Sequence, residues 1–265
     1  MAVTPKDAFD FAIARARHQL TLYDILHDSR QRNIRRDWKE RFCEFMRWPK
    51  SEKIVRVDGA SKQSMLILRE SVGLTRSEFA HEYLSEILRG VVTASVSALD
   101  RYIHDQVTDK SLQLLRRAEA DVPKELRQIK VPLLTAKRSM EKLRGDSSAR
   151  PGALLKAELR EILHKEETFQ SVASVEKGAK MLGIRDFWGR ILAELPRFSS
   201  KGEVQEELRA VTHRRNQIVH EADLIIQERP RDTKLRDIGR SDAENALAFV
   251  EEFVFGVDRL VAEDC

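Results

Sequence analysis

The chain has 265 residues, of which 42% are apolar and 34% charged, the balance of a globular protein with a heavily charged surface. Its formal net charge of +4 permits nucleic acid as a partner but does not by itself predict one. Because no apolar run of about 18 residues and no signal-peptide pattern occur, and because Cys43 and Cys265 lack metal-ligand spacing, we expect a cytoplasmic protein without a membrane span, metal or cofactor.

Cap and stop signals predict mostly helices in the first half of the chain. A cap followed by proline, Thr4-Pro5-x-Asp7, begins the first helix. In order, we expect a helix to about His27, a helix over 34–47 ended by Pro49, a short extended piece over 51–60, and a long helix from the Thr75-x-x-Glu78 capping box to about Val107.

The second half is also predicted to be helical. Residues 110–143 read as helix interrupted at Pro123 and Pro132, and 145–152 as a loop. Further helices are expected over 153–165, over 171–182 ended by Gly183, over 185–194, from the Ser200-x-x-Glu203 capping box to Gln227, and from the Ser241-x-x-Glu244 capping box to Val261. The predicted fold class is therefore all-α, with an N-terminal helical extension over 1–60 and a helical domain over 61–265.

An Arg that precedes a His by a few residues is a known ribonuclease spacing. The chain contains three such pairs, Arg76 with His81 and both Arg214 and Arg215 with His220, which is about the number that chance predicts in an Arg-rich sequence. Arg215 stands out because it falls on the apolar stripe of a predicted helix, where a partly buried cation is costly without a partner or ligand. His220 shares a second line with Asn216 and Asp223, so we expect Arg215 to reach across to this edge.

These residue types suit metal-independent cleavage of RNA by its own 2′-hydroxyl. His220 would carry a proton near neutral pH, and Arg215 would stand beside the charged phosphorane. One His serves one proton transfer in each site, so a symmetric dimer would supply the second. In the alternative interpretation, Arg215 pairs with a carboxylate such as Asp100 and His220 is an ordinary helix residue.

Three other features are candidates for a functional role. Asp100 and His104 lie four residues apart and could orient a substrate or Arg215, although a surface pair is the simpler interpretation. Residues 30–47 are basic and aromatic, which can mean stacking on RNA, but the helical spacing of the aromatic residues favours a core or dimer contact. The segment 228–240 follows the predicted site as a charged loop whose candidate RNA-binding residues are Arg229, Arg231, Lys234, Arg236 and Arg240.

The segment from Val211 to Asp223, which reads VTHRRNQIVHEAD, resembles the signature helix of the HEPN superfamily and is most similar to its RiboL-PSP-HEPN branch. The segments over 94–105 and 177–188 resemble the same branch. The resemblance covers residues 65–262 and implies a HEPN-like helical bundle with additional N-terminal helices. Some HEPN toxins have a Tyr two residues after the His, where this chain has Ala222, so control by modification of that Tyr is not expected here.

The resemblance implies a homodimeric, metal-independent endoribonuclease in toxin–antitoxin, antiviral-defence or RNA-processing settings. Carried over by position, Arg215 and His220 would be catalytic and Asn216 would orient one of them, with Arg214, Asp223, Asp100 and His104 in support. RNA would be the substrate, and an antitoxin or another regulatory protein a possible partner. The alternative is a non-catalytic HEPN module that binds RNA, nucleotide or a partner protein.

Overall fold

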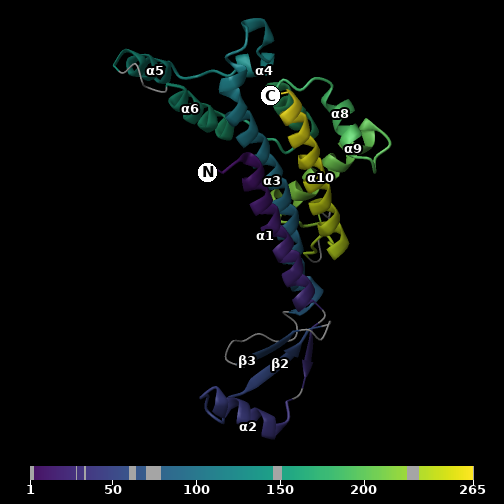
Figure 1. Ribbon diagram of the computed structural model, residues 1–265. Helices are drawn as coiled ribbons and strands as arrows, with labels where there is room; N and C mark the ends of the chain where they lie inside the picture. Colours follow the sequence, from purple (N-terminus) through teal and green to yellow (C-terminus); the bar gives the residue numbers. More distant parts are fainter. Residues whose placement is uncertain are drawn as a thin grey trace. The chain divides into compact units, whose positions relative to one another are not determined.

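The computed structural model describes residues 3–27, 29–32, 34–59, 64–69, 79–145, 151–225 and 233–264 (Figure 1). The fold is all-α, as composition and periodicity predict, and it also contains one small sheet. The elements are α1 (Pro5–Leu26), β1 (Arg30–Arg32), α2 (Arg36–Phe45), β2 (Ile54–Asp58), β3 (Met65–Arg69), α3 (His81–Leu114), the 3-10 turn η3 (Glu119–Asp121), α4 (Lys124–Arg127), α5 (Leu133–Gly145), α6 (Pro151–Glu166), α7 (Val172–Met181), α8 (Phe187–Glu194), α9 (Lys201–His220) and α10 (Arg240–Asp264). No helix in these ranges combines the length and the apolar character that crossing a membrane would require.

The chain folds into two compact units that are discontinuous in sequence. Unit 1 comprises residues 1–14, 92–236 and 245–265, and unit 2 comprises 15–91 and 237–244. The helices α1, α3 and α10 each contribute residues to both units.

The core of unit 1 is built on α3 and α10, which run side by side (Figure 1). The buried hydroxyl of Tyr102 donates a hydrogen bond of 2.7 Å to Asp258 on α10, and Phe9 packs edge-on against the Tyr102 ring. On the other flank, Trp188 of α8 packs against Phe253 of α10. Burial of these large rings removes apolar surface from water and so helps to stabilise the unit.

The helix α7 is positioned by two glycines. A Cβ at Gly178 would lie 2.6 Å from Ile103 on α3, so only glycine allows this approach of α7 to α3. Gly183 ends the helix as the sequence predicts: its φ is +80°, and the N–H of Ile184 bonds to the carbonyl of Ala179 in a Schellman arrangement.

Unit 2 contains the sheet, which has the order β1-β2-β3 with both pairs antiparallel. The register places Arg30 opposite Asp58 and Ile54 opposite Arg69. The short extended piece expected over 51–60 is confirmed as β2, whereas β1 and β3 were not predicted. Residues 1–60 are therefore not purely helical, because the β-branched run beginning at Ile54 pairs with strands on both sides.

Of the three predicted capping boxes, the one at Ser241 does not mark the start of its helix. Thr75 and Glu78 lie outside the described residues. Ser241 lies inside α10, which begins at Arg240, and the side chain of Asp242 instead accepts a hydrogen bond from the N–H of Gly239. This start uses the same kind of carboxylate-to-amide bond as a capping box, displaced along the chain.

Candidate functional site

The candidate site lies at the C-terminal end of α9 in unit 1. The helix starts where the sequence predicts, because the Ser200 side chain caps it by accepting a hydrogen bond from the N–H of Glu203. Its buried stripe includes Val204, Leu208 and Val211. Arg215 continues this stripe at helical spacing, so its partial burial follows from the sequence pattern, as expected.

Arg215 lies within reach of both polar neighbours that the sequence suggested. Its Nη1 donates a hydrogen bond of 3.1 Å to the side-chain oxygen of Asn216 and lies 3.5 Å from Nε2 of His220. Its Nε atom is buried and has no hydrogen-bond partner among the described residues. The imidazole of His220 is exposed, so the pair presents one cation held by an amide and one accessible imidazole.

Arg214, the neighbouring arginine, has a different environment. Both of its terminal nitrogens bond to the carboxylate of Asp223, which is only 1% exposed. Such a forked, charge-assisted pair fixes the direction of the guanidinium. Of the two tandem arginines, Arg214 therefore binds the Asp223 carboxylate, and Arg215 lies near His220.

The Arg214–Asp223 pair also explains where α9 ends. The helix was predicted to continue to Gln227 but ends at His220. Ala222 and Asp223 both have positive φ values, of 50° and 57°, and the N–H of Asp223 bonds back to the carbonyl of Gln217. The expected line of Asn216, His220 and Asp223 on one helix face was therefore wrong, because Asp223 lies beyond the helix and is buried.

After the turn, the chain pairs with the described part of the charged loop predicted over 228–240, which contains no helix or strand over 233–239. Leu224 bridges Leu235 in antiparallel fashion, and the N–H of Ile225 bonds to the carbonyl of Lys234. The N–H of Arg236 bonds to the carbonyl of Asp223. These bonds connect the segment to Asp223 and to the two residues that follow it.

The five candidate RNA-binding residues of this segment do not form a group in the described structure. Arg229 and Arg231 lie outside the described residues. Arg236 binds the carbonyl of Leu224 and pairs with Glu221, and Arg240, in unit 2, pairs with Asp24 and Glu244. Lys234 is the described member that is exposed and close in sequence to the site.

Asp100 and His104 form a buried network, so the simpler expectation of a surface pair was wrong. Asp100 accepts hydrogen bonds from the N–H of Phe169 (2.5 Å) and from Gln170 (2.9 Å), and lies 3.5 Å from Nε2 of His104. His104 is 3% exposed and stacks on His164 at 4.6 Å. No described contact joins Asp100 to Arg215, so Asp100 does not neutralise it.

The electrostatics of Asp100 follow from these contacts. Burial raises the pKa of Asp100, but the hydrogen bonds from His104, Gln170 and the Phe169 amide outweigh burial and hold the pKa below its usual value. Sequence reasoning missed His164, Phe169 and Gln170, because they come from the end of α6 and the loop after it, far along the chain. No local spacing relates them to Asp100.

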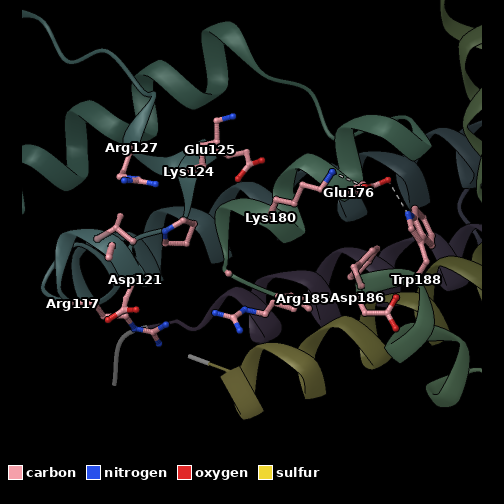
Figure 2. Close-up of a pocket in the computed structure, with 16 residues that line it drawn as sticks. Arg117, Asp121, Lys124, Glu125, Arg127, Glu176, Lys180, Arg185, Asp186 and Trp188 are labelled. Carbon is pink, nitrogen blue, oxygen red and sulfur yellow. Dashed lines mark hydrogen bonds and ion pairs between the residues drawn. The ribbon is translucent and has the colours of Figure 1, made fainter.

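A cavity of about 590 Å³ lies elsewhere in unit 1, between the η3–α4 region and the start of α8 (Figure 2). Figure 2 shows that Glu176 in its wall is engaged by Lys180 and by the indole N–H of Trp188. The remaining wall carries both signs of charge, including Arg127, Arg185 and Asp121.

The described residues contain no cluster of three or more His, Cys, Asp or Glu side chains arranged to hold a metal ion. Comparison of the chain with protein-family models, with curated proteins and with solved structures found no match. The local geometry around Arg215 and His220 is therefore the basis for a functional proposal.

Proposed function

We propose that the protein is a metal-independent endoribonuclease of HEPN type that acts as a homodimer, with Arg215 and His220 in a composite active site. The observation that carries this proposal is the 3.5 Å approach of the Arg215 guanidinium to the His220 imidazole at the exposed end of α9. An exposed His beside a cation that is bound by an amide rather than by a carboxylate suits an anionic substrate.

The proposed chemistry follows from these two groups. The 2′-hydroxyl of the RNA loses its proton and attacks the adjacent phosphorus, while the leaving 5′-oxygen gains a proton. His220 carries one of these protons, and the guanidinium of Arg215 stabilises the charge that develops on the phosphorane. The products are a 2′,3′-cyclic phosphate and a 5′-hydroxyl.

A dimer enters the proposal because each chain supplies one His220. Two proton transfers need two carriers, and a two-fold axis that brings two α9 ends together provides them. An antitoxin or another regulatory protein would act on this composite site. The proposal also includes a role for this ribonuclease in a toxin–antitoxin or antiviral-defence system.

The direct test incubates the purified protein with single-stranded RNA in EDTA and identifies the ends of the products. We expect cyclic phosphate and 5′-hydroxyl ends, and a loss of rate of about 100-fold or more in His220→Ala. The matched control is His213→Ala, since His213 lies on the same helix, is exposed and contacts Gln217 rather than Arg215. Unchanged cleavage by His220→Ala would show the assignment to be wrong.

The composite site has its own test, in which wild-type protein is re-associated with an excess of His220→Ala protein. If each site needs both histidines, mixed dimers are inactive and activity falls faster than the fraction of wild-type chains. Activity that falls in simple proportion would argue for a site within one chain. RNA affinity without any products would instead favour a non-catalytic binding module.

A further inference from the structure

The helix α2 of unit 2 has aromatic residues that the fold leaves exposed. The sequence pattern favours a core or dimer contact for Trp38, Phe42 and Phe45, yet Phe45 is 83% and Trp38 39% exposed. The buried residue of this helix is Cys43. The aromatic residues are therefore not explained by the core of the unit.

Trp38 and Phe42, together with Trp48 from the segment after α2, form an ordered stack, and Phe45 lies outside it. Trp38 and Phe42 are parallel, with centroids 5.0 Å apart, and Trp48 meets Phe42 edge-on at 5.8 Å. The guanidinium of Arg69, from β3, lies over the Trp48 ring at 5.3 Å. Flat faces held at fixed spacing, with a cation at one end, resemble the surface on which successive bases stack.

The basic and acidic side chains of α2 lie on different faces of the helix. At 3.6 residues per turn, Arg41, Phe45, Trp38 and Phe42 fall within an arc of about 100° on α2. The acidic residues Asp37, Glu40 and Glu44 occupy a separate arc, and Glu40 is paired with Arg36. The aromatic face is thus bordered by basic rather than acidic side chains.

Three arginines near this face have no carboxylate partner within the described ranges. Arg35 precedes α2, Arg41 lies on it and Arg47 follows it, and all three are exposed. By contrast, Arg36, Arg56 and Arg69 are each paired with an acidic residue. Exposed, unpaired cations beside stacked rings complement a chain of phosphates and bases.

We propose that this face, defined by Trp38, Phe42, Phe45, Arg35, Arg41 and Arg47, binds single-stranded nucleic acid by stacking bases on the rings and pairing phosphates with the arginines. The inference goes beyond the proposed cleavage site, because it concerns binding through unit 2 and does not require catalysis. If the proposed function holds, the bound strand is the RNA substrate.

The test measures binding to single-stranded RNA in EDTA, using full-length protein with His220→Ala so that cleavage does not interfere. Two of the three tryptophans, Trp38 and Trp48, belong to the aromatic stack, so we expect oligouridine to quench the intrinsic fluorescence. The double variant Trp38→Ala/Phe45→Ala should weaken binding by about tenfold or more, since each stacked base contributes about fivefold to over 100-fold. Leu22→Ala, an exposed apolar position on α1 of the same unit, is the matched control and should bind normally.

The charge component is tested separately with Arg35→Gln/Arg41→Gln/Arg47→Gln. We expect the slope of log affinity against log salt to fall by about 2, because three phosphate contacts are lost at about 0.7 each. Inorganic polyphosphate has no bases. The affinity of the protein for polyphosphate should therefore fall in the triple arginine variant but not in Trp38→Ala/Phe45→Ala. Circular dichroism confirms that each variant is folded.

If the aromatic double variant and the arginine triple variant both kept the wild-type affinity for RNA, the inference would be overturned. So would a change in sedimentation of Trp38→Ala/Phe45→Ala without a change in affinity, since the face would then be a protein interface. These outcomes are independent of the proposed function, which is tested separately by the cleavage of RNA by the protein with an intact His220 and by the loss of that cleavage in His220→Ala.

Discussion

The carboxylate of Asp223, which is 1% exposed, receives both terminal nitrogens of Arg214 from nine residues earlier in the chain. This pair ends α9 and assigns different tasks to the tandem arginines. With Arg214 committed to Asp223, Arg215 is the one placed against His220. The pair therefore connects the folding of the helix end with the geometry of the proposed site.

Replacing Asp223 by Ala should destabilise unit 1 substantially. The change leaves the Arg214 cation without its buried carboxylate, and removing one partner of such a pair costs about 3–5 kcal/mol. Urea unfolding monitored by circular dichroism measures the loss. Glu221→Ala is the control, because Glu221 is 39% exposed and pairs with Arg236 on the surface, where a pair contributes about 0–1 kcal/mol. Equal losses in the two variants would contradict a structural role for Asp223.

Local signals predicted the start of α9 but not its end. The Ser200 cap involves a residue three positions away, so a sequence pattern reveals it. The end depends on Asp223 leaving the helical line, with positive φ at two non-glycine residues, to meet Arg214. Neither Ala222 nor Asp223 is a glycine, which is the usual sequence sign of a helix end with positive φ. The apolar pattern therefore predicts a helix that continues to Gln227.

The same distinction holds for the candidate site residues. The approach of Arg215 to His220 lies within two turns of one helix, and the sequence predicts it. The surroundings of Asp100 depend on Phe169 and Gln170, which long-range folding brings to α3. Periodicity identifies Asp100 and His104 as neighbours but cannot show that the fold buries them.

Gly178→Ala should destabilise the packing of α7 on α3. The added methyl would lie 2.6 Å from Ile103 and 3.1 Å from Phe169, so the helices must separate, at a cost of about 1–3 kcal/mol. Thermal unfolding measures the effect. Gly202→Ala on α9 is the matched control, because its nearest neighbour would be the Ser200 hydroxyl at 3.8 Å, and an alanine in a helix is slightly favourable. A neutral Gly178→Ala would show that α7 does not pack this closely.

Asp100→Asn should show a pH-dependent loss of stability. The folded protein holds the pKa of Asp100 below 3.8, so the ionised carboxylate contributes stability that is present above 3.8 and is lost as the pH falls through the lowered value. We expect Asp100→Asn to be less stable by about 1–3 kcal/mol at neutral pH. This difference should shrink as the pH falls from 3.8 through the lowered pKa of Asp100, where the carboxyl of the folded protein becomes protonated. Urea unfolding across this range measures it, and a difference independent of pH would contradict the assigned hydrogen bonds.

Asn216→Ala should lower the cleavage rate of the proposed enzyme while leaving RNA affinity nearly unchanged. Asn216 holds the same Nη1 atom of Arg215 that faces His220, so its loss lets the guanidinium turn away from the phosphorane. A hydrogen bond to a charged group contributes about 1.5–3 kcal/mol, which corresponds to a decrease in kcat of roughly 10- to 100-fold. Asn216→Asp should also be slow, because a carboxylate would neutralise Arg215 toward an anionic substrate.

Arg209→Ala, on the same helix but paired with Glu206, is the control and should keep full activity. Steady-state kinetics separate kcat from KM, and an effect on KM alone would assign Asn216 to RNA binding rather than to positioning Arg215.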